Sequence, residues 1–224
     1  MHPCLMPVPP RGEPRDRLSA TVRTVAGADA AYSPDGALLC AAVAVLGLPD
    51  LRVLEVSRVV EPVPAPYRPG FLAEREAPAL VRALGRLGSA PDAVMVDAHG
   101  MAHPARWGAA CHVGLAARVP TVGVAKSRLV GTHGPVPPAR GAWVPLKLQG
   151  RTVGAVVRTR EGVRPVYVSV GHRVSLDTAV RLVLAVSRFR IPEPIRAAHR
   201  AAREGLEGAA AEGASAHRGG GSGP

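Results

Sequence analysis

The sequence has few aromatic residues and few cysteines. Aromatic side chains make up 3% of the 224 residues, and the three cysteines are scattered along the chain. An odd number of isolated cysteines without a C-x-x-C spacing argues against both a disulfide framework and a zinc ribbon. The chain also lacks a run of about 20 apolar residues, which a membrane-spanning helix would need. We therefore expect a soluble protein of the reducing cytoplasm with no membrane partner.

Acidic residues are the minority among the charged ones. The chain has 17 Asp and Glu against 28 Lys and Arg, a formal net charge of +11. This balance favours a polyanionic partner such as nucleic acid, because basic side chains displace counterions from phosphates. Abundant arginine, alanine, glycine and proline also fit a genome-wide codon bias, so charge alone does not require that partner.

Composition divides the chain into a body and two terminal segments. Residues 1–17 are rich in proline and arginine, and residues 205–224 form a tail of glycine, alanine and serine. Neither segment can bury a core, so both are predicted to be disordered. The body, residues 18–204, is long enough for one domain with a single core.

Hydrophobic periodicity in the body predicts an α/β fold with a mixed sheet. Three strands come first, separated by turns with Pro-Asp, and are predicted at residues 22–31, 37–46 and 51–60. The later strands are predicted at residues 93–97, 121–125, 142–148, 152–158 and 165–170. Helices are predicted at residues 71–87, 107–117, 176–186 and 193–203. An antiparallel meander followed by alternating helices and strands is typical of a mixed sheet flanked by helices.

Asp97 directly follows the short apolar strand at residues 93–96. Ligands bind beyond the carboxyl ends of the strands in open α/β sheets, which makes Asp97 a candidate functional residue. The alternative is that Asp97 only turns the chain toward the following glycine, since both residue types favour turns.

Two other carboxylates stand where apolar side chains are expected. Glu76 lies one turn from two leucines on the apolar stripe of helix 71–87, and Asp29 interrupts an alanine-rich strand on the face of Gly27. A buried carboxylate is costly unless it is paired or binds a metal. If the two strands are neighbours, Asp29, Glu76 and Asp97 converge on a site suited to Mg²⁺ or Mn²⁺. The alternatives are a Glu76 that reaches solvent at the stripe's edge and an Asp29 in a turn.

His99 and His103 have the spacing of two zinc ligands on a helix. The glutamate of H-E-x-x-H is absent, however, and Gly100 and Pro104 disfavour a helix there. We prefer His103 as a group that contacts phosphate or supports the metal ligands. A purely structural hydrogen bond is the alternative.

Six segments, in this order, resemble the endonuclease V family of deoxyinosine-directed nucleases, which have a ribonuclease H-like fold. They are residues 25–32 (VAGADAAY), 66–76 (PYRPGFLAERE), 96–104 (VDAHGMAHP), 120–127 (PTVGVAKS), 167–172 (YVSVGH) and 190–194 (RIPEP). The resemblance implies that Asp29, Glu76 and Asp97 bind Mg²⁺, with Mn²⁺ as a substitute. It also makes residues 18–204 the catalytic domain, in which His103 and Lys126 act at the phosphate.

The resemblance further implies a group of substrate-binding residues. Pro66 and Pro69 would hold Tyr67 as a wedge at the lesion, where its ring replaces an extruded base. Gly100 would allow close backbone approach to that base, and His199 corresponds to a position near the active site. An ordinary proline-rich connector and a surface histidine are the alternatives from local sequence. Ala98 and Ala105 depart from the family, which usually has glycine and often arginine at these positions.

The resemblance therefore predicts a monomeric, Mg²⁺-dependent phosphodiester hydrolase of DNA repair. It would recognise deoxyinosine in DNA and cut on its 3′ side, leaving 3′-OH and 5′-phosphate ends; inosine-containing RNA is a second candidate substrate. Two other functions remain open from the residues: a ribonuclease H-like nuclease for branched substrates and a non-catalytic nucleic-acid-binding module.

Overall fold

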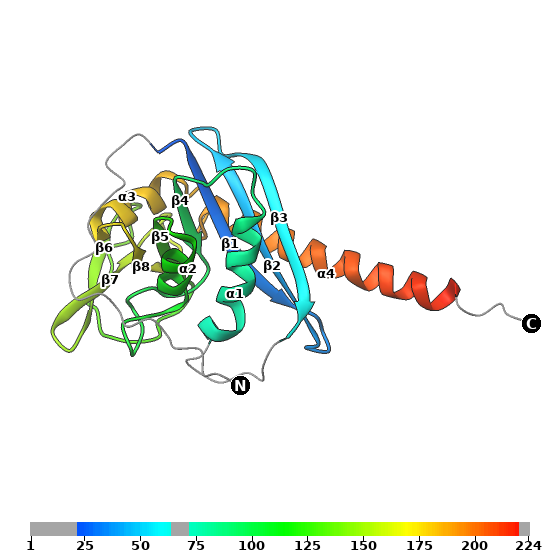
Figure 1. The fold of residues 1–224 in the computed structure, drawn as a ribbon. Coiled ribbons are helices and arrows are strands. Elements are labelled where there is room, and N and C mark those ends of the chain that lie inside the picture. Colours follow the sequence, from blue (N-terminus) through cyan, green and yellow to red (C-terminus); the bar gives the residue numbers. More distant parts are fainter. Residues whose placement is uncertain (1–21, 64–71, 220–224) are drawn as a thin grey trace, which may run out of the picture.

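The computed structural model describes residues 22–63 and 72–219. They form an eight-stranded mixed sheet with helices on both faces (Figure 1). The strand order is β3-β2-β1-β4-β5-β8-β7-β6. The predicted α/β fold, an antiparallel meander followed by parallel strands between helices, is confirmed.

The meander and the parallel strands meet at β1. The antiparallel strands are β1 (Thr24–Tyr32), β2 (Leu38–Gly47) and β3 (Arg52–Pro62). β1 also pairs in parallel with β4 (Ala93–Val96), which pairs in parallel with β5 (Thr121–Ala125). Because the carboxyl ends of parallel strands lie at one edge of a sheet, the residues that follow β4 and β5 come out beside the last part of β1.

The other half of the sheet is antiparallel. β5 pairs with β8 (Val166–His172), β8 with β7 (Arg151–Val157), and β7 with the edge strand β6 (Trp143–Leu148). These strands continue the sheet away from the meander, so β3 and β6 are its two edges.

The sheet buries apolar side chains on both of its faces. α1 (Leu72–Gly85) and α2 (Ala109–Ala117) pack on one face, where alanines and valines of β1, β2 and β4 meet leucines and alanines of the helices. α3 (Leu176–Ala185) and the start of α4 (Glu193–Gly219) pack on the other face. Strands buried on both faces have nearly continuous apolar sequences, as β2 and β5 do.

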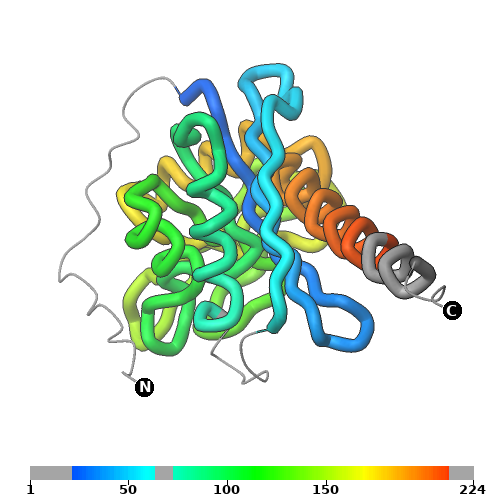
Figure 2. The backbone as a smooth tube through the Cα atoms, turned by 45° about the vertical axis from the view of Figure 1, so that its right-hand side comes forward, coloured from blue at the N-terminus to red at the C-terminus, as the bar shows by residue number. Residues whose placement is uncertain are grey.

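The last helix is longer than its sequence indicated. α4 continues to Gly219 and extends away from the sheet (Figures 1 and 2), so the helix end predicted at Arg203 is wrong. Alanine is the strongest helix former, and the alanines between the glycines of this segment outweigh them. Within the described ranges, no helix is long and apolar enough to cross a membrane.

Candidate active site

Asp29 and Asp97 lie side by side at the carboxyl ends of β1 and β4. The backbone N–H of Asp97 donates to the carbonyl of Ala28 (3.0 Å), which fixes Asp97 next to Asp29. Asp29 is buried, with 9% of its surface exposed, and its Oδ1 accepts from the N–H of Ala30 (2.8 Å). The register of the parallel strands thus brings together two carboxylates that are far apart in sequence.

Glu76 approaches the same strand ends from α1. It is buried, as its place on the leucine stripe predicted, and its Oε1 accepts from the Tyr32 hydroxyl (2.9 Å). The Arg75 guanidinium lies over the Tyr32 ring, 4.6 Å from the centroid. Tyr32 follows Asp29 by three residues at the end of β1, so it links the helix carboxylate to the strand that carries Asp29.

Lys126 forms an ion pair with Asp97. It follows β5, the parallel neighbour of β4, so its Nζ reaches Asp97 Oδ2 from the adjacent strand end. The Asp97 side chain is nearly buried, while the lysine is half exposed. Lys126 is therefore paired although half of its side chain is exposed.

His199 contacts the other strand carboxylate. Its Nδ1 donates to Asp29 Oδ2 (2.8 Å), and half of its side chain remains exposed. This contact depends on the close packing of α4 on β1. Gly27, on the same strand face as Asp29, lies directly against α4: a Cβ on Gly27 would be 1.9 Å from the Pro194 carbonyl oxygen.

The site carries more negative than positive charge. Burial raises the pKa of Asp29, and the nearby charge of Asp97 raises it further. Burial raises the pKa of Glu76 to about 7, with a hydrogen bond from Tyr32 opposing the shift and the charges of Asp29 and Asp97 adding to it. The charges of Lys126 and Arg75 lower these pKa values, but burial and the neighbouring carboxylates outweigh them.

This donor set fits a hard divalent cation, which takes oxygen ligands and compensates such charge. The carboxylates are not gathered into a preformed cluster, however. Among the residues that the structure describes, no three His, Cys, Asp or Glu side chains are arranged as a metal site. Asp29, Asp97 and Glu76 instead each have a protein partner, namely His199, Lys126 and Tyr32.

Two side chains hold the backbone around Lys126, a role that local sequence reasoning gave to neither of them. Arg190 Nη2 donates to the Lys126 carbonyl (2.7 Å), and its Nε donates to the Arg164 carbonyl (3.0 Å). His99 Nε2 donates to the next carbonyl, that of Ser127 (3.1 Å), so His99 ties the loop after Asp97 to the strand end of Lys126. The only signal was the position of Arg190 in the segment 190–194 and of His99 beside Asp97.

The loop after Asp97 is tightly packed. The N–H of Gly100 donates to the buried Ser169 hydroxyl (2.9 Å), and a Cβ on Gly100 would lie 2.1 Å from the Val170 carbonyl oxygen. The sequence predicted that Gly100 lets an extruded base come close to the backbone. In the structure, the backbone of β8 lies against Gly100. His103 Nδ1 accepts from the N–H of Ala105 (3.3 Å) within the same loop.

The residues expected to form the wedge, Pro66, Tyr67 and Pro69, lie outside the described residues.

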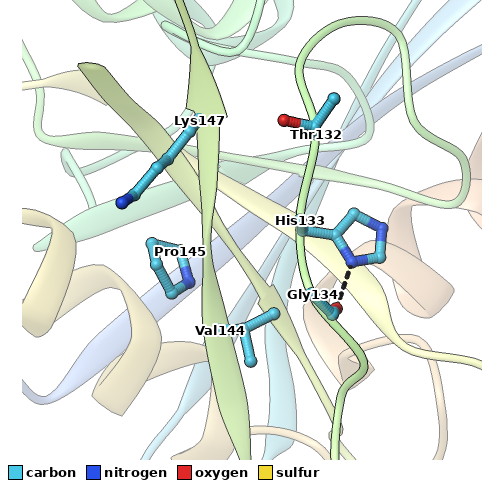
Figure 3. Close-up of a pocket in the computed structure, with 6 residues that line it drawn as sticks. All are labelled: Thr132, His133, Gly134, Val144, Pro145 and Lys147. Atoms are coloured by element: carbon cyan, nitrogen blue, oxygen red, sulfur yellow. Dashed lines mark hydrogen bonds between the residues drawn. The ribbon is translucent and has the colours of Figure 1, made fainter. Parts of the chain in front are cut away.

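A groove elsewhere on the molecule is separate from this site. It has a volume of about 360 Å³ and lies between the loop after β5 and the edge strand β6 (Figure 3). Its lining residues are Thr132, His133, Gly134, Val144, Pro145 and Lys147. β8 and β7 separate β6 from β5, so the groove includes none of the carboxylates.

Comparison with known proteins gives consistent matches over most of the chain. The Endonuclease V family model matches residues 11–200. Endonuclease V of Roseiflexus castenholzii is 54% identical over 185 residues, which are 82% of each chain.

Solved structures match in the same way. The crystal structure of Endonuclease V from Streptomyces avermitilis has a TM-score of 0.81 at 39% identity, covering 84% of this chain and 83% of that one. Endonuclease V of Ciona intestinalis was solved in complex with a 24mer DNA containing an inosine followed by a ribo-adenosine. It has a TM-score of 0.73 at 26% identity and covers 83% of this chain and 86% of that one.

Proposed function

Because this chain belongs to the Endonuclease V family, we propose that it uses Asp29, Glu76 and Asp97 to cut a nucleic-acid strand on the 3′ side of deoxyinosine. The observation that carries the proposal is that Asp29 and Asp97 lie side by side at the ends of β1 and β4, Asp97 paired with Lys126, while the buried Glu76 of α1 is near enough for their charges to raise its pKa. Members of this family are endonucleases, and the proposal assigns the chemistry to residues of this chain.

Asp29, Glu76 and Asp97 would hold Mg²⁺, with Mn²⁺ as a substitute. When bound, such an ion polarises a phosphate oxygen and lowers the pKa of a water molecule. His199 keeps the Asp29 carboxylate in place through its 2.8 Å hydrogen bond. We assign to the ammonium group of Lys126, half exposed beside Asp97, the neutralisation of charge on the scissile phosphate. His103 would contact the same phosphate.

Hydrolysis replaces one bond to phosphorus by another. The oxygen of water bonds to phosphorus and the bond from phosphorus to the 3′ oxygen breaks, which leaves a 3′-OH and a 5′-phosphate. The departing oxygen takes up a proton.

The substrate proposal rests on the relative from Ciona intestinalis, which was solved with inosine-containing DNA. For this chain we infer deoxyinosine in DNA as the substrate, with inosine in RNA as the second candidate. An enzyme that acts beside an altered base must take that base out of the stack, which costs least where pairing is weak. Tyr67, held between Pro66 and Pro69, would fill the space that the base leaves, and the Gly100 loop would approach the extruded base.

The test uses labelled DNA and RNA strands with and without one inosine, incubated in Mg²⁺ or in Ca²⁺. We expect cleavage only beside inosine and only in Mg²⁺. Asp97→Ala should abolish cleavage while strand binding stays measurable, because the substitution removes a metal ligand but no positive charge. The matched control is Asp177→Ala, which removes an exposed carboxylate on α3.

Full activity of Asp97→Ala would overturn the assignment of the carboxylates. Cleavage at branches without regard to inosine would support the branched-substrate nuclease instead. Binding without cleavage in every metal would support a non-catalytic module.

A further inference from the structure

Phe189 is an exposed aromatic residue in a chain that has only seven Phe, Trp and Tyr residues. It lies in the loop between α3 and α4, and 43% of its surface is exposed. Single exposed apolar side chains are common on protein surfaces and need no special explanation. The surroundings of Phe189 therefore decide whether it has a role.

The backbone at Phe189 is fixed on both sides. The preceding residue, Arg188, donates from Nη2 to the Asp50 carbonyl (2.7 Å). The following residue, Arg190, donates to the Lys126 carbonyl (2.7 Å), and its own carbonyl accepts from the buried Thr159 hydroxyl (2.7 Å). Phe189 thus lies on a loop that hydrogen bonds tie to Asp50 on one side and to Lys126, the residue paired with Asp97, on the other.

One side of the ring is covered by a cation from α4. The guanidinium carbon of Arg196 lies 4.1 Å from the Phe189 ring centroid, a cation–π contact. Arg196 also forms an ion pair with the mostly buried Glu193, at 3.7 Å between Nε and Oε2. Arg196 precedes His199 by three residues, so both lie on one side of α4, and His199 contacts Asp29. Phe189 therefore lies, through Arg196, about one turn of α4 from the residue that contacts Asp29.

We propose that Phe189, backed by Arg196, is a stacking platform for a base of the substrate strand next to the cleavage site. The inference rests on the proposed function and adds a binding residue to it. Proteins that hold single strands combine positive charge along the backbone with aromatic rings on which bases stack. Phe189 offers a half-exposed ring with Arg196 against it, and Arg188 and Arg190 are its neighbours in sequence. When the inosine leaves the stack, its neighbour loses a stacking partner, and a ring on a fixed loop replaces that partner without ordering a mobile segment.

The test compares Phe189→Ala with Phe189→Trp, which keeps a ring. Trp143→Ala is the matched control, because Trp143 is equally exposed (42%) but lies on the far edge strand β6. Binding of a fluorescent inosine-containing strand is measured by anisotropy in Ca²⁺. Loss of a stacked aromatic weakens binding roughly 5- to 100-fold. We expect a loss in that range for Phe189→Ala, near wild-type affinity for Phe189→Trp, and no change for Trp143→Ala.

A second series locates the stacked base. An abasic nucleotide is moved through the positions on both sides of inosine, and wild type and Phe189→Ala are compared at each position. At one position the missing base should weaken wild-type binding to the level of the variant, and there the two proteins should bind equally. Equal affinity of wild type and Phe189→Ala for every strand overturns the proposal. So does a loss in Phe189→Ala that persists at every abasic position, because the ring would then act on the fold.

Failure of the platform and failure of the proposed function give different results. If Phe189→Ala binds and cuts as wild type does, only the platform is wrong. If wild type neither binds nor cuts inosine-containing strands, the proposed function is wrong and the platform falls with it.

Discussion

Gly27→Ala should displace the helix that holds one half of the active site. The ideal Cβ at this position lies 1.9 Å from the carbonyl oxygen and 2.1 Å from the carbonyl carbon of Pro194, and 2.6 Å from the N of Ile195. All three are main-chain atoms in the first turns of α4, so no side chain can rotate away. Van der Waals contact at about 3.4 Å requires α4 to move by more than 1 Å.

The structure links that movement to activity through one hydrogen bond. His199 lies about one turn farther along α4, and its 2.8 Å bond to Asp29 cannot survive a shift of that size. A misplacement of about 1 Å in a catalytic arrangement can reduce the rate roughly 100-fold. Overpacking a buried contact costs about 1–3 kcal/mol, which lowers the melting temperature of a chain this size by about 2–4 °C per kcal/mol.

The assay is single-turnover cleavage of an inosine-containing DNA strand, together with thermal unfolding. Gly208→Ala serves as the control, because Gly208 is exposed on α4 with no atom within 4 Å of a built Cβ. There the alanine should raise stability by about 0.5–1 kcal/mol and leave cleavage unchanged. Wild-type cleavage and melting temperature for Gly27→Ala would refute both the packing of α4 on β1 and its role in placing His199.

Three further predictions concern the site and its substrate. Arg190→Gln should slow cleavage and lower the melting temperature, because Arg190 holds the Lys126 carbonyl. In a protein that already carries Lys126→Met, Arg190→Gln should still lower the melting temperature but should no longer slow cleavage. Burial raises the pKa of Glu76 to about 7, so the folded state holds this proton more tightly than the unfolded state. In EDTA the free energy of unfolding should therefore fall by about 3 kcal/mol as the pH rises from about 4.5 to 7. Glu76→Gln should remove that fall, and a fall of the same size in the variant would contradict the assignment. Tyr67→Ala should weaken the preference for inosine more than the rate of cutting, and an unchanged preference in a competition assay would eliminate the wedge.

The sequence was sufficient for much of the fold because periodicity reflects burial. Alternating and continuous apolar runs predicted each strand of the sheet to within a few residues, and Glu76 on a leucine stripe predicted a buried carboxylate. It failed at the end of α4, where glycines among the alanines suggested a tail. The single domain and the disordered N-terminal segment stay predictions, whereas the tail predicted from residue 205 is helical as far as Gly219.

What the sequence by itself determined is which residues are out of place: Asp29 in a small-residue strand, Glu76 on an apolar stripe and Asp97 at a strand end. Only the tertiary structure decided what each one contacts. The parallel register of β1, β4 and β5 pairs Lys126 with Asp97, and the packing of α4 on Gly27 brings His199 to Asp29. Local sequence reports the burial of a residue because burial follows the period of its own helix or strand. It does not report contacts between residues 29 positions apart, as Lys126 and Asp97 are, or 170 apart, as His199 and Asp29 are, since these depend on strand order and on how closely two backbones approach.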